Sequence, residues 1–474
     1  MAYICKDIDI EIVPNAPFKE DKLNRGIIAQ TLTAIVNAYA NSGAVLAIDG
    51  EWGAGKTTFI KMWKQHLMDN GYNTLYFNAW ETDFVEDPLI ALMGELKEVI
   101  KSDANFESLT NKVCRIGLKI GGGLIKAGAK QIGIDSDIVT AGIDETTNIC
   151  QEQINSYNAH KAELKDFKQK LSEYVAAQAQ GNELPIVFFI DELDRCNPHY
   201  AVKLLERVKH LFEVPNIIFV LAVNIRQLQH AIQGYYGSSS IDGEEYLKRF
   251  IDLNYSLPTP DLKDYAKVLY DRHSFDEFFD HDLRMSHRGL DGEKDLFFSM
   301  AKDLISNSNV NLRVVNKIFA YTRLVLQCYP VTAKIYPDLL FLLCFIKLTR
   351  PIFYNRICSK EYTLQELVYA LEEELPASIF TPKQYSFTER HLCWAVAALL
   401  MRYNYSSRGI PTESNFKGQK CEGQSYCEFP LKTNKINKAE LFNALTYYYN
   451  SDQYFQDGLG YMIERINLMC KLRL

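Results

Sequence analysis

Over the first 260 residues, short apolar runs alternate with amphipathic stretches, a pattern typical of a parallel α/β sheet. Residues 44–49 (AVLAID) form an apolar run of strand length, and the apolar positions of residues 58–67 recur at helical spacing. Asn70-Gly71 provides a stop signal for that helix. The same reasoning predicts further strands at residues 73–77, 185–190, 216–223 and 250–257. It predicts further helices at residues 21–39, 87–100, 193–211 and 225–232.

After Pro258 the strand-like runs stop and helical periodicity continues. A polar loop rich in Ser, Gly, Lys and Glu interrupts this part at residues 404–437. We therefore predict two domains, an α/β domain of residues 1–260 and an all-α region of residues 261–474. The helices predicted in the second domain are residues 261–271, 295–305, 311–326, 337–348, 364–375, 389–403, 438–449 and 459–472.

Residues 102–182 interrupt the alternation of strands and helices, and we interpret them as a helical insertion. Within the insertion, residues 112–134 are rich in glycine and, if helical, carry their basic residues on one face. A basic amphipathic segment can lie on an anionic membrane or bind a partner helix. We favour a plainer interpretation, in which the segment packs on its own domain or on a neighbouring subunit. The basic residues are Lys112, Arg115, Lys119, Lys126 and Lys130.

The loop between the first predicted strand and its helix carries the pattern G-x-x-x-x-G-K-[ST] (GEWGAGKT). Such a loop aims backbone N–H groups at phosphate oxygens, and the following helix adds the positive end of its dipole. We expect Lys56 to reach the β- and γ-phosphates of a nucleoside triphosphate and the Thr57 hydroxyl to ligate Mg²⁺. The pattern comprises Gly50, Glu51, Trp52, Gly53, Ala54, Gly55, Lys56 and Thr57.

Polar residues follow two other predicted strands. Asp191 and Glu192 come directly after the run at residues 185–190, at the carboxyl edge where open α/β sheets bind ligands. Asp191 is the expected water-mediated magnesium ligand, and Glu192 is placed to polarise the water that attacks the γ-phosphate. Asn224 follows the run at residues 216–223. It could sense the γ-phosphate or cap the next helix, and the sequence leaves both roles open.

Composition limits the class and the surroundings of the protein. The 474 residues are 47% hydrophobic and 23% charged, as in soluble globular proteins. A net charge of −7 weighs against a general nucleic-acid coat. Eleven cysteines without framework spacing favour reduced thiols. The N-terminus does not resemble a signal peptide, and no apolar run approaches the roughly 18 residues of a membrane span. We therefore expect a cytoplasmic protein.

Four blocks resemble the KAP family of P-loop NTPases, in family order. They are "IDGEWGAGKTTFIKMW", "YFNAWETDFVEDPLIALMGEL", "IVFFIDELDRCNPHYAVKLLERVKHLFEVPNIIFVLAVNIRQLQHAI" and "EYLKRFIDLNYSLPTP". A weaker fifth match, "NLRVVNKIFAYTR", covers residues 311–323. The resemblance implies a RecA/AAA-like parallel sheet with an extra strand between the two strands that end at the phosphate loop and at Asp191. It also implies Mg-ATP as the ligand and a helical lid.

The resemblance also implies roles for single residues. It extends the phosphate loop to Thr58, and it makes Asp194 a support for the site. Arg195 could act across a subunit interface, and Arg313 would be the lid arginine that approaches the γ-phosphate. Two departures stand out: the insertion holds no membrane span, and Asn224 stands where many relatives carry Asp.

The expected function is an Mg-dependent ATPase whose hydrolysis of ATP to ADP and phosphate drives a conformational or assembly change in a larger complex. Bacterial members of the family often occur in mobile or anti-phage defence settings. A homo-oligomer with a protein partner from the same system is expected, because trans arginines complete such sites. Two alternatives stay open: a nucleotide-gated scaffold with little turnover, and a nucleic-acid-stimulated motor. Candidates for the trans cation are Arg195, Lys248 and Arg249.

Overall fold

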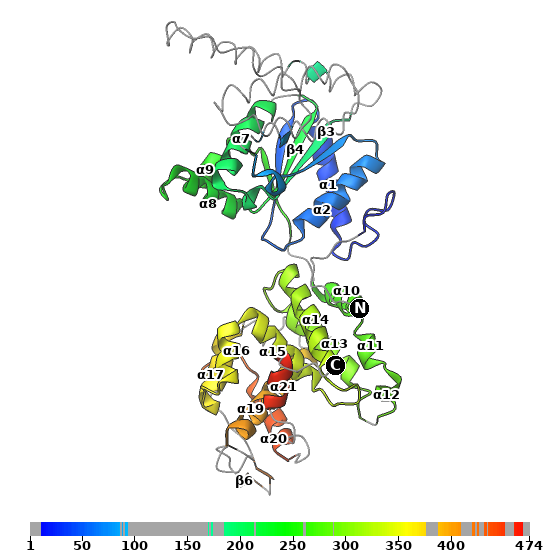
Figure 1. The fold of residues 1–474 in the computed structure, drawn as a ribbon, viewed down its shortest axis with the longest axis vertical. Helices are drawn as coiled ribbons and strands as arrows, with labels where there is room; N and C mark the ends of the chain where they lie inside the picture. The colour runs from blue at the N-terminus through cyan, green and yellow to red at the C-terminus, as the bar shows by residue number, and fades with distance from the viewer. Residues whose placement is uncertain are drawn as a thin grey trace. The chain divides into compact units, whose positions relative to one another are not determined.

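In the computed structural model the chain forms two compact units that divide between Thr259 and Pro260, an NTPase unit and a helical unit (Figure 1). The structure describes residues 11–85, 184–212, 215–258, 262–287, 289–375, 387–408, 420–421, 424–425, 431–433, 435–450 and 459–467, with isolated positions between 88 and 173.

The first unit is built on five parallel strands in the order β2-β3-β4-β1-β5. β4 separates β1, which ends at the phosphate loop, from β3, which ends at Asp191. This is the extra strand that the family resemblance implies, so the predicted parallel α/β class is confirmed. The strands are β1 Ala44–Asp49, β2 Thr74–Asn78, β3 Ile186–Asp191, β4 Ile217–Val223 and β5 Leu253–Ser256.

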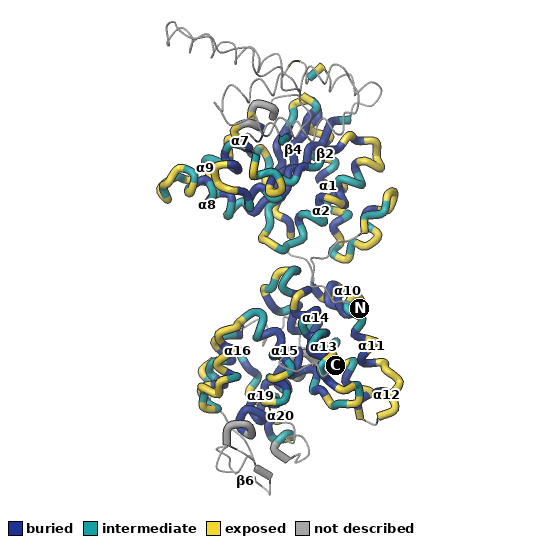
Figure 2. The backbone as a smooth tube through the Cα atoms, in the orientation of Figure 1, coloured by how far each residue is buried: buried dark blue, intermediate teal, exposed yellow. Residues whose placement is uncertain are grey.

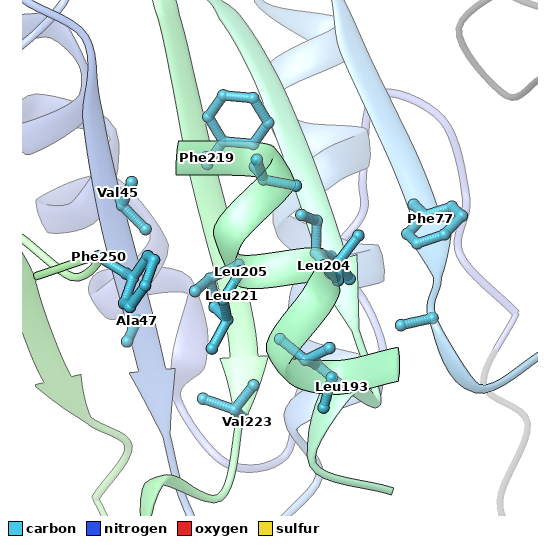
Figure 3. Packing of buried hydrophobic residues seen from close by; sticks show 14 of the residues in the cluster. Val45, Ala47, Phe77, Leu193, Leu204, Leu205, Phe219, Leu221, Val223 and Phe250 are labelled. Atoms are coloured by element: carbon cyan, nitrogen blue, oxygen red, sulfur yellow. The ribbon is translucent and has the colours of Figure 1, made fainter. Parts of the chain in front are cut away.

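Helices cover both faces of this sheet (Figure 1). α1 (Arg25–Ala38) and α2 (Lys56–Asp69) pack on one face, where Trp63 meets Phe189 edge-on at 5.4 Å between ring centroids. The other face packs against α7 (Pro198–Phe212), α8 (Ile225–Tyr236) and α9 (Gly243–Leu247). Figure 3 shows Leu204 and Leu205 of α7 over the strand residues.

Burial on both faces explains the continuous apolar runs read from the sequence. Every residue of β3 and β4 is buried (Figure 2). Successive side chains contribute to the apolar clusters on opposite faces of the sheet, Phe188 and Ile190 to one and Val187 and Phe189 to the other. The sheet is thereby held rigid between two apolar layers. The polar residues at the ends of its strands are therefore held in fixed positions.

Some predicted boundaries of the NTPase unit are wrong in detail. The helix expected from residue 193 begins at Pro198, after a 3-10 turn, η3 (Leu193–Arg195). Glu192 takes a left-handed conformation with φ 60°, which ends the strand and starts that turn. β5 is shorter than predicted, because the Phe250 N–H donates to the Leu247 carbonyl at 2.9 Å and closes a turn before the strand.

The second unit is helical. α15 lies at its centre, packed against α13, α14, α16, α19 and α21, and its residues 337–346 are all buried. The helices are α10 Leu262–Arg272, α11 Asp276–Phe279, α12 Asp282–Met285, α13 Glu293–Ser306, α14 Leu312–Gln327, α15 Pro337–Thr349, α16 Pro351–Cys358, α17 Leu364–Glu374, α19 Phe387–Arg408, α20 Lys438–Asn450 and α21 Leu459–Ile466.

The sequence pattern did not predict the short elements of this unit. α11, α12 and α16 span one or two turns, too few for a helical period to appear. The prediction of a helical second region is confirmed, and the structure adds a hairpin of β6 (Lys420–Cys421) and β7 (Gln424–Ser425) inside the polar loop. Strands of two residues leave no apolar run to read.

The predicted insertion at residues 102–182 lies almost wholly outside the described residues, and its basic segment at 112–134 lies wholly outside them. Its helical content and its partners therefore stay predictions. Among the helices that are described, none combines the length and the apolar character needed to cross a bilayer.

Candidate nucleotide-binding site

The phosphate loop runs from the carboxyl end of β1 into the first turn of α2, as the sequence predicts. Gly53 and Gly55 take left-handed conformations with φ 81° and 82°, which side chains with a Cβ rarely adopt. The Gly50 N–H donates to the Val223 carbonyl at 3.2 Å and ties the loop to the tip of β4. The loop is thus fixed at the carboxyl edge of the sheet, with the N-terminus of α2 behind it.

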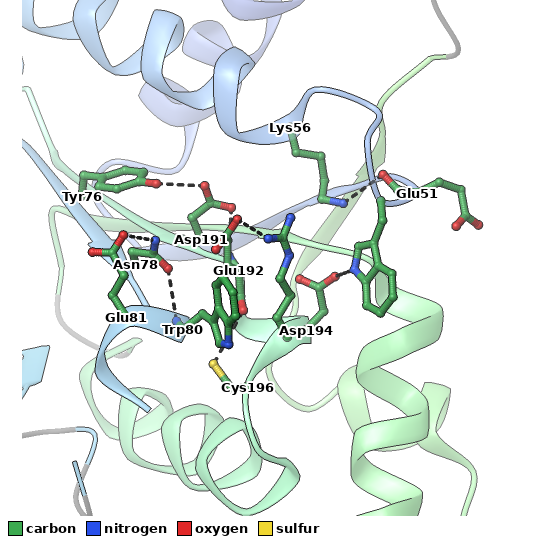
Figure 4. A network of polar contacts seen from close by, with 12 residues as sticks. Glu51, Lys56, Tyr76, Asn78, Trp80, Glu81, Asp191, Glu192, Asp194 and Cys196 are labelled. Atoms are coloured by element: carbon green, nitrogen blue, oxygen red, sulfur yellow. Dashed lines mark hydrogen bonds and ion pairs between the residues drawn. The ribbon is translucent and has the colours of Figure 1, made fainter. Parts of the chain in front are cut away.

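Lys56 is a buried cation at the centre of the site (Figure 4). Its Nζ donates to the carbonyl of Gly50 and to that of Glu51, the latter at 3.3 Å. Burial lowers the pKa of the ammonium, and the charges of Asp194 and Asp191 oppose this shift. The ammonium group therefore faces both the loop and the acidic residues that follow β3.

Asp191 ends β3 with only 1% of its surface exposed. Its carboxylate accepts from the Tyr76 hydroxyl at 3.0 Å, from the Glu192 N–H at 2.8 Å and from the Thr57 side chain. Burial raises the pKa of Asp191, and these three hydrogen bonds oppose the rise. Thr57 and Asp191, which the sequence proposed as metal ligands, thus lie within hydrogen-bond distance of each other.

The chemistry of these two oxygens fits magnesium. Mg²⁺ is commonly held by one or two protein oxygens together with waters and substrate phosphates. Within the part of the chain that the structure describes, no group of three His, Cys, Asp or Glu side chains could form a cage for a metal ion. Thr57 and Asp191 would therefore hold the ion from one side, and the nucleotide phosphates would complete its shell.

Glu192 lies beside this pair, at the start of the η3 turn. Its carboxylate pairs with the Arg195 guanidinium, with Oε1 at 2.8 Å from a guanidinium nitrogen, and it also contacts the Asn78 side chain. Burial raises the pKa of Glu192, while the positive charge of Arg195 acts in the opposite direction. A carboxylate of raised pKa next to a phosphate loop has the properties of a general base.

Asn224 touches both the loop and a helix end. Its Oδ1 accepts from the Gln227 N–H at 3.2 Å and caps α8, so the capping role is confirmed. Its Nδ2 donates to Glu51 Oε2 at 3.0 Å, which places the amide against the phosphate loop. The role of γ-phosphate sensor stays a prediction.

Two contacts of the phosphate loop were not anticipated. Buried Arg25 of α1 donates to the carbonyls of Ala54 at 2.6 Å and Gly55 at 3.2 Å, and burial lowers its pKa to about 10. The Trp52 indole N–H donates to Asp194 Oδ2 at 2.6 Å, which joins the loop to the acidic block formed by Asp191, Glu192 and Asp194. A signal for Arg25 was present, because it stands four residues before Ala29 on the buried stripe of α1.

The predicted lid arginine and the three candidate trans cations each have different neighbours in the structure. Arg313 lies at the start of α14 in the second unit, so its role as lid arginine stays a prediction. Lys248 pairs with Glu245 at 3.1 Å, and Arg249 lies over the Tyr246 ring at 5.8 Å from its centroid. Arg195 pairs with Glu192 of its own chain. A trans role for any of them stays a prediction.

A glycine-rich loop between a buried strand and a helix, with two carboxylates at the end of a parallel strand that one intervening strand separates from it, defines a P-loop NTPase. The model of the KAP family P-loop domain matches residues 24–325. The chain belongs to this family, as the sequence blocks indicated.

Similar proteins are distant. The phage T7 exclusion protein of Escherichia coli (strain K12) is 21% identical over 273 residues, which are 54% of this chain and 35% of that protein. ABC transporter G family member 1 of Dictyostelium discoideum is 33% identical over 79 residues, 17% of this chain and 9% of that protein. The chain thus spans about a third of the first relative and less than a tenth of the second.

Solved structures are similar only loosely. A DNA replication initiation factor is 12% identical, with a TM-score of 0.32, and the match covers 93% of this chain and 98% of that one. The ORC2 protein of Aeropyrum pernix in complexes with ADPNP and ADP is 13% identical, with a TM-score of 0.33 and coverage of 80% and 88%. The fold assignment rests on the strand order described above.

Proposed function

We propose that this protein binds Mg-ATP and hydrolyses it to ADP and phosphate. The observation that carries the proposal is the convergence of Lys56 and Thr57 with Asp191 and Glu192 at one edge of the sheet. Lys56 and the loop N–H groups would bind the phosphates, and Thr57 and Asp191 would hold the magnesium ion. Magnesium, when bound, neutralises charge on the transferred phosphoryl group.

Glu192 has the role of base in this proposal. It accepts a proton from a water molecule as that water attacks the γ-phosphorus, and the bond between the γ-phosphorus and the leaving oxygen of ADP breaks. Asn224 follows β4, the strand between β1 and β3, and its amide contacts Glu51 of the loop; it is proposed to orient the γ-phosphate. Arg313 is proposed to approach the same phosphate from the helical unit.

We further propose that hydrolysis drives a conformational or assembly change in an anti-phage defence system. Support comes from the exclusion protein of Escherichia coli, whose similarity to this chain spans 54% of it. A homo-oligomer and a protein partner of the same system belong to this proposal. We place the activity in the cytoplasm, where reduced thiols such as the buried Cys196 and Cys344 persist.

The experiment is ATP turnover by the purified full-length protein with Mg²⁺, compared with Glu192→Gln. The Gln side chain keeps the size of Glu192 and removes the base, so we expect a turnover at least ~100-fold lower with ATP affinity retained. Turnover that is the same in both proteins would contradict the proposed mechanism. Arg356→Ala, an exposed position in the helical unit, is a control.

A plating assay tests the cellular role. Cells that express the wild-type protein should resist phages that plaque on cells with Lys56→Ala or Glu192→Gln. If Glu192→Gln protects fully while Lys56→Ala does not, nucleotide binding suffices, and the nucleotide-gated scaffold replaces the ATPase. Stimulation of turnover by DNA or RNA, lost at high salt, would favour the motor instead.

A further inference from the structure

The sequence block Asn78-Ala79-Trp80, which follows β2, has no role in the chemistry proposed above. The structure locks this block to the end of β3 through the main chain. Asn78 lies opposite Asp191 in the parallel ladder, and the Ala79 N–H donates to the Asp191 carbonyl at 2.9 Å. The Asn78 side chain accepts from the Trp80 N–H at 3.2 Å and donates to Glu81 at 2.8 Å. Trp80 is thus held beside the acidic block by contacts that do not use its ring.

The η3 turn brings Arg195 to Glu192. The Arg195 N–H donates to the Glu192 carbonyl at 3.0 Å, so the two side chains leave the same tight turn and meet at 2.8 Å. The Arg195 guanidinium carbon lies 5.7 Å from the centroid of the Trp80 ring, within the range of a cation–π contact. One guanidinium therefore contacts both the proposed base and the indole of the β2 block.

This pair differs from an ordinary surface ion pair. Exposed pairs contribute little, because two long side chains lose rotamer freedom for a screened attraction. Here the turn fixes the backbone, the indole restricts the guanidinium, and the side chains of Arg195 and Glu192 are only 26% and 14% exposed. The contact therefore restricts the orientation of Glu192 more than it stabilises the fold.

We propose that Arg195, which lies over the Trp80 ring, acts in its own chain as a positioning residue that holds Glu192 in its catalytic orientation. This inference rests on the proposed ATPase function, and it differs from the trans role that the sequence suggested for Arg195. It also gives the Asn78-Ala79-Trp80 block a role, because the block fixes the ring on which the guanidinium lies.

Steady-state kinetics of the full-length protein test the inference. Arg195→Ala should lower kcat by about 100-fold, the scale of a misplaced catalytic group, with KM and ATP affinity within about threefold of wild type. Trp80→Ala should lower kcat by about 3–10-fold, the worth of a cation–π contact. Arg195→Lys should recover part of the loss, because an ammonium keeps the charge without the planar fork.

Arg356→Ala provides the matched control. Arg356 also lies over an aromatic ring, at 4.3 Å from the Tyr362 centroid, and pairs with a glutamate, Glu361, at 3.2 Å. It lies in the helical unit, so its loss should leave kcat unchanged. Glu192→Gln, measured in parallel, separates the two proposals. Inactive Glu192→Gln with unchanged Arg195→Ala overturns only the positioning role, whereas absence of wild-type turnover overturns both.

Mixed oligomers distinguish action in cis from action in trans. Subunits with Arg195→Ala keep the base, and subunits with Glu192→Gln keep the arginine. If Arg195 acts in its own chain, no site in a mixture of the two holds both groups, and turnover stays at the level of the separate variants. Recovery of turnover on mixing would overturn the cis role. A kcat of Arg195→Ala above wild type would also overturn the proposal, since it would make Arg195 a brake.

Discussion

Each unit of this protein sets an arginine against a glutamate, and the two pairs have different surroundings. Arg284 and Glu293 of the helical unit form an ion pair with side chains 0% and 7% exposed. Arg284 also donates to the carbonyls of Val331 at 2.6 Å and Ala333 at 2.9 Å, and its guanidinium lies over the Phe278 ring. Main-chain carbonyls and aromatic rings enclose this pair.

The Arg195–Glu192 pair of the NTPase unit is partly open and lies among other charges. Lys56, Asp191 and Asp194 all act electrostatically on this site, and the group gathers where parallel strands end. The comparison teaches that buried charge alone does not mark chemistry. Charge satisfied by its own backbone holds a fold together, whereas charge gathered at an open sheet edge indicates a ligand.

The largest expected effect sharpens the comparison in the NTPase unit. Lys56→Met should lower ATP turnover by about 1,000-fold, because it removes a cation from the transferred phosphate. Thermal stability should not fall, because an apolar side chain relieves the desolvation that lowers the pKa of Lys56. ATP turnover and a thermal melt, measured on the same preparation of Lys56→Met, test the expected loss of activity and the expected retention of stability. If Lys56→Met retained turnover and had a lower melting temperature, Lys56 would serve the stability of the fold and not the chemistry, contrary to the comparison.

Replacing the buried arginine of the helical unit by methionine should lower stability and leave ATP turnover unchanged. Arg284→Met leaves Glu293 buried without its partner and should cost about 3–5 kcal/mol of unfolding free energy. Denaturant unfolding measures the loss, and kcat of the folded fraction should not change. Adding Glu293→Leu should restore much of the stability. A stable Arg284→Met protein with impaired turnover would show that this pair serves the chemistry.

A smaller effect is expected where the loop meets the acidic block. Trp52→Phe removes the indole donor and leaves the buried Asp194, 8% exposed, without that hydrogen bond. The free energy of unfolding should fall by about 1–3 kcal/mol. A double-mutant cycle with Asp194→Asn measures the coupling between the two side chains. Additive effects of the two substitutions would mean that the contact does not join the loop to the block.

The smallest effect is a pH dependence in the helical unit. Burial lowers the pKa of His273, and the hydrogen bond that its Nε2 donates to Asn316 Oδ1 at 3.0 Å opposes this shift. The unfolded chain therefore binds more protons than the folded one as the pH falls through about 6.5, and stability falls in that window by at most ~1.4 kcal/mol per pH unit. The measurement is the unfolding free energy as a function of pH, and His273→Gln should reduce its slope near pH 6.5. Identical curves for the two proteins would contradict the assignment.

Much of the NTPase unit could be predicted from the sequence. Strands buried on both faces leave continuous apolar runs, so β1 was placed at its observed bounds, and the family resemblance supplied the position of β4. The phosphate loop and Asp191-Glu192 stand next to those runs. Their meeting at one edge follows from parallel strand order.

The contacts that refine the site could not be predicted. Arg25, Trp52 and Tyr76 reach their partners over 29, 142 and 115 residues of sequence. The apolar stripe of α1 indicates that Arg25 is buried, but no local pattern encodes which groups these three side chains contact. The turn at Glu192 was missed because a left-handed conformation is rare for glutamate. The sequence suggested that Arg195 could act across a subunit interface, and it does not show that this turn brings Arg195 back to Glu192 of the same chain.

The most direct test of the site is the nucleotide bound to the protein after incubation with Mg-ATP. The wild-type protein should be recovered with ADP. Glu192→Gln should be recovered with the same total amount of nucleotide as uncleaved ATP, because it binds the phosphates and lacks the base. ADP on both proteins, or no nucleotide on either, would contradict the account.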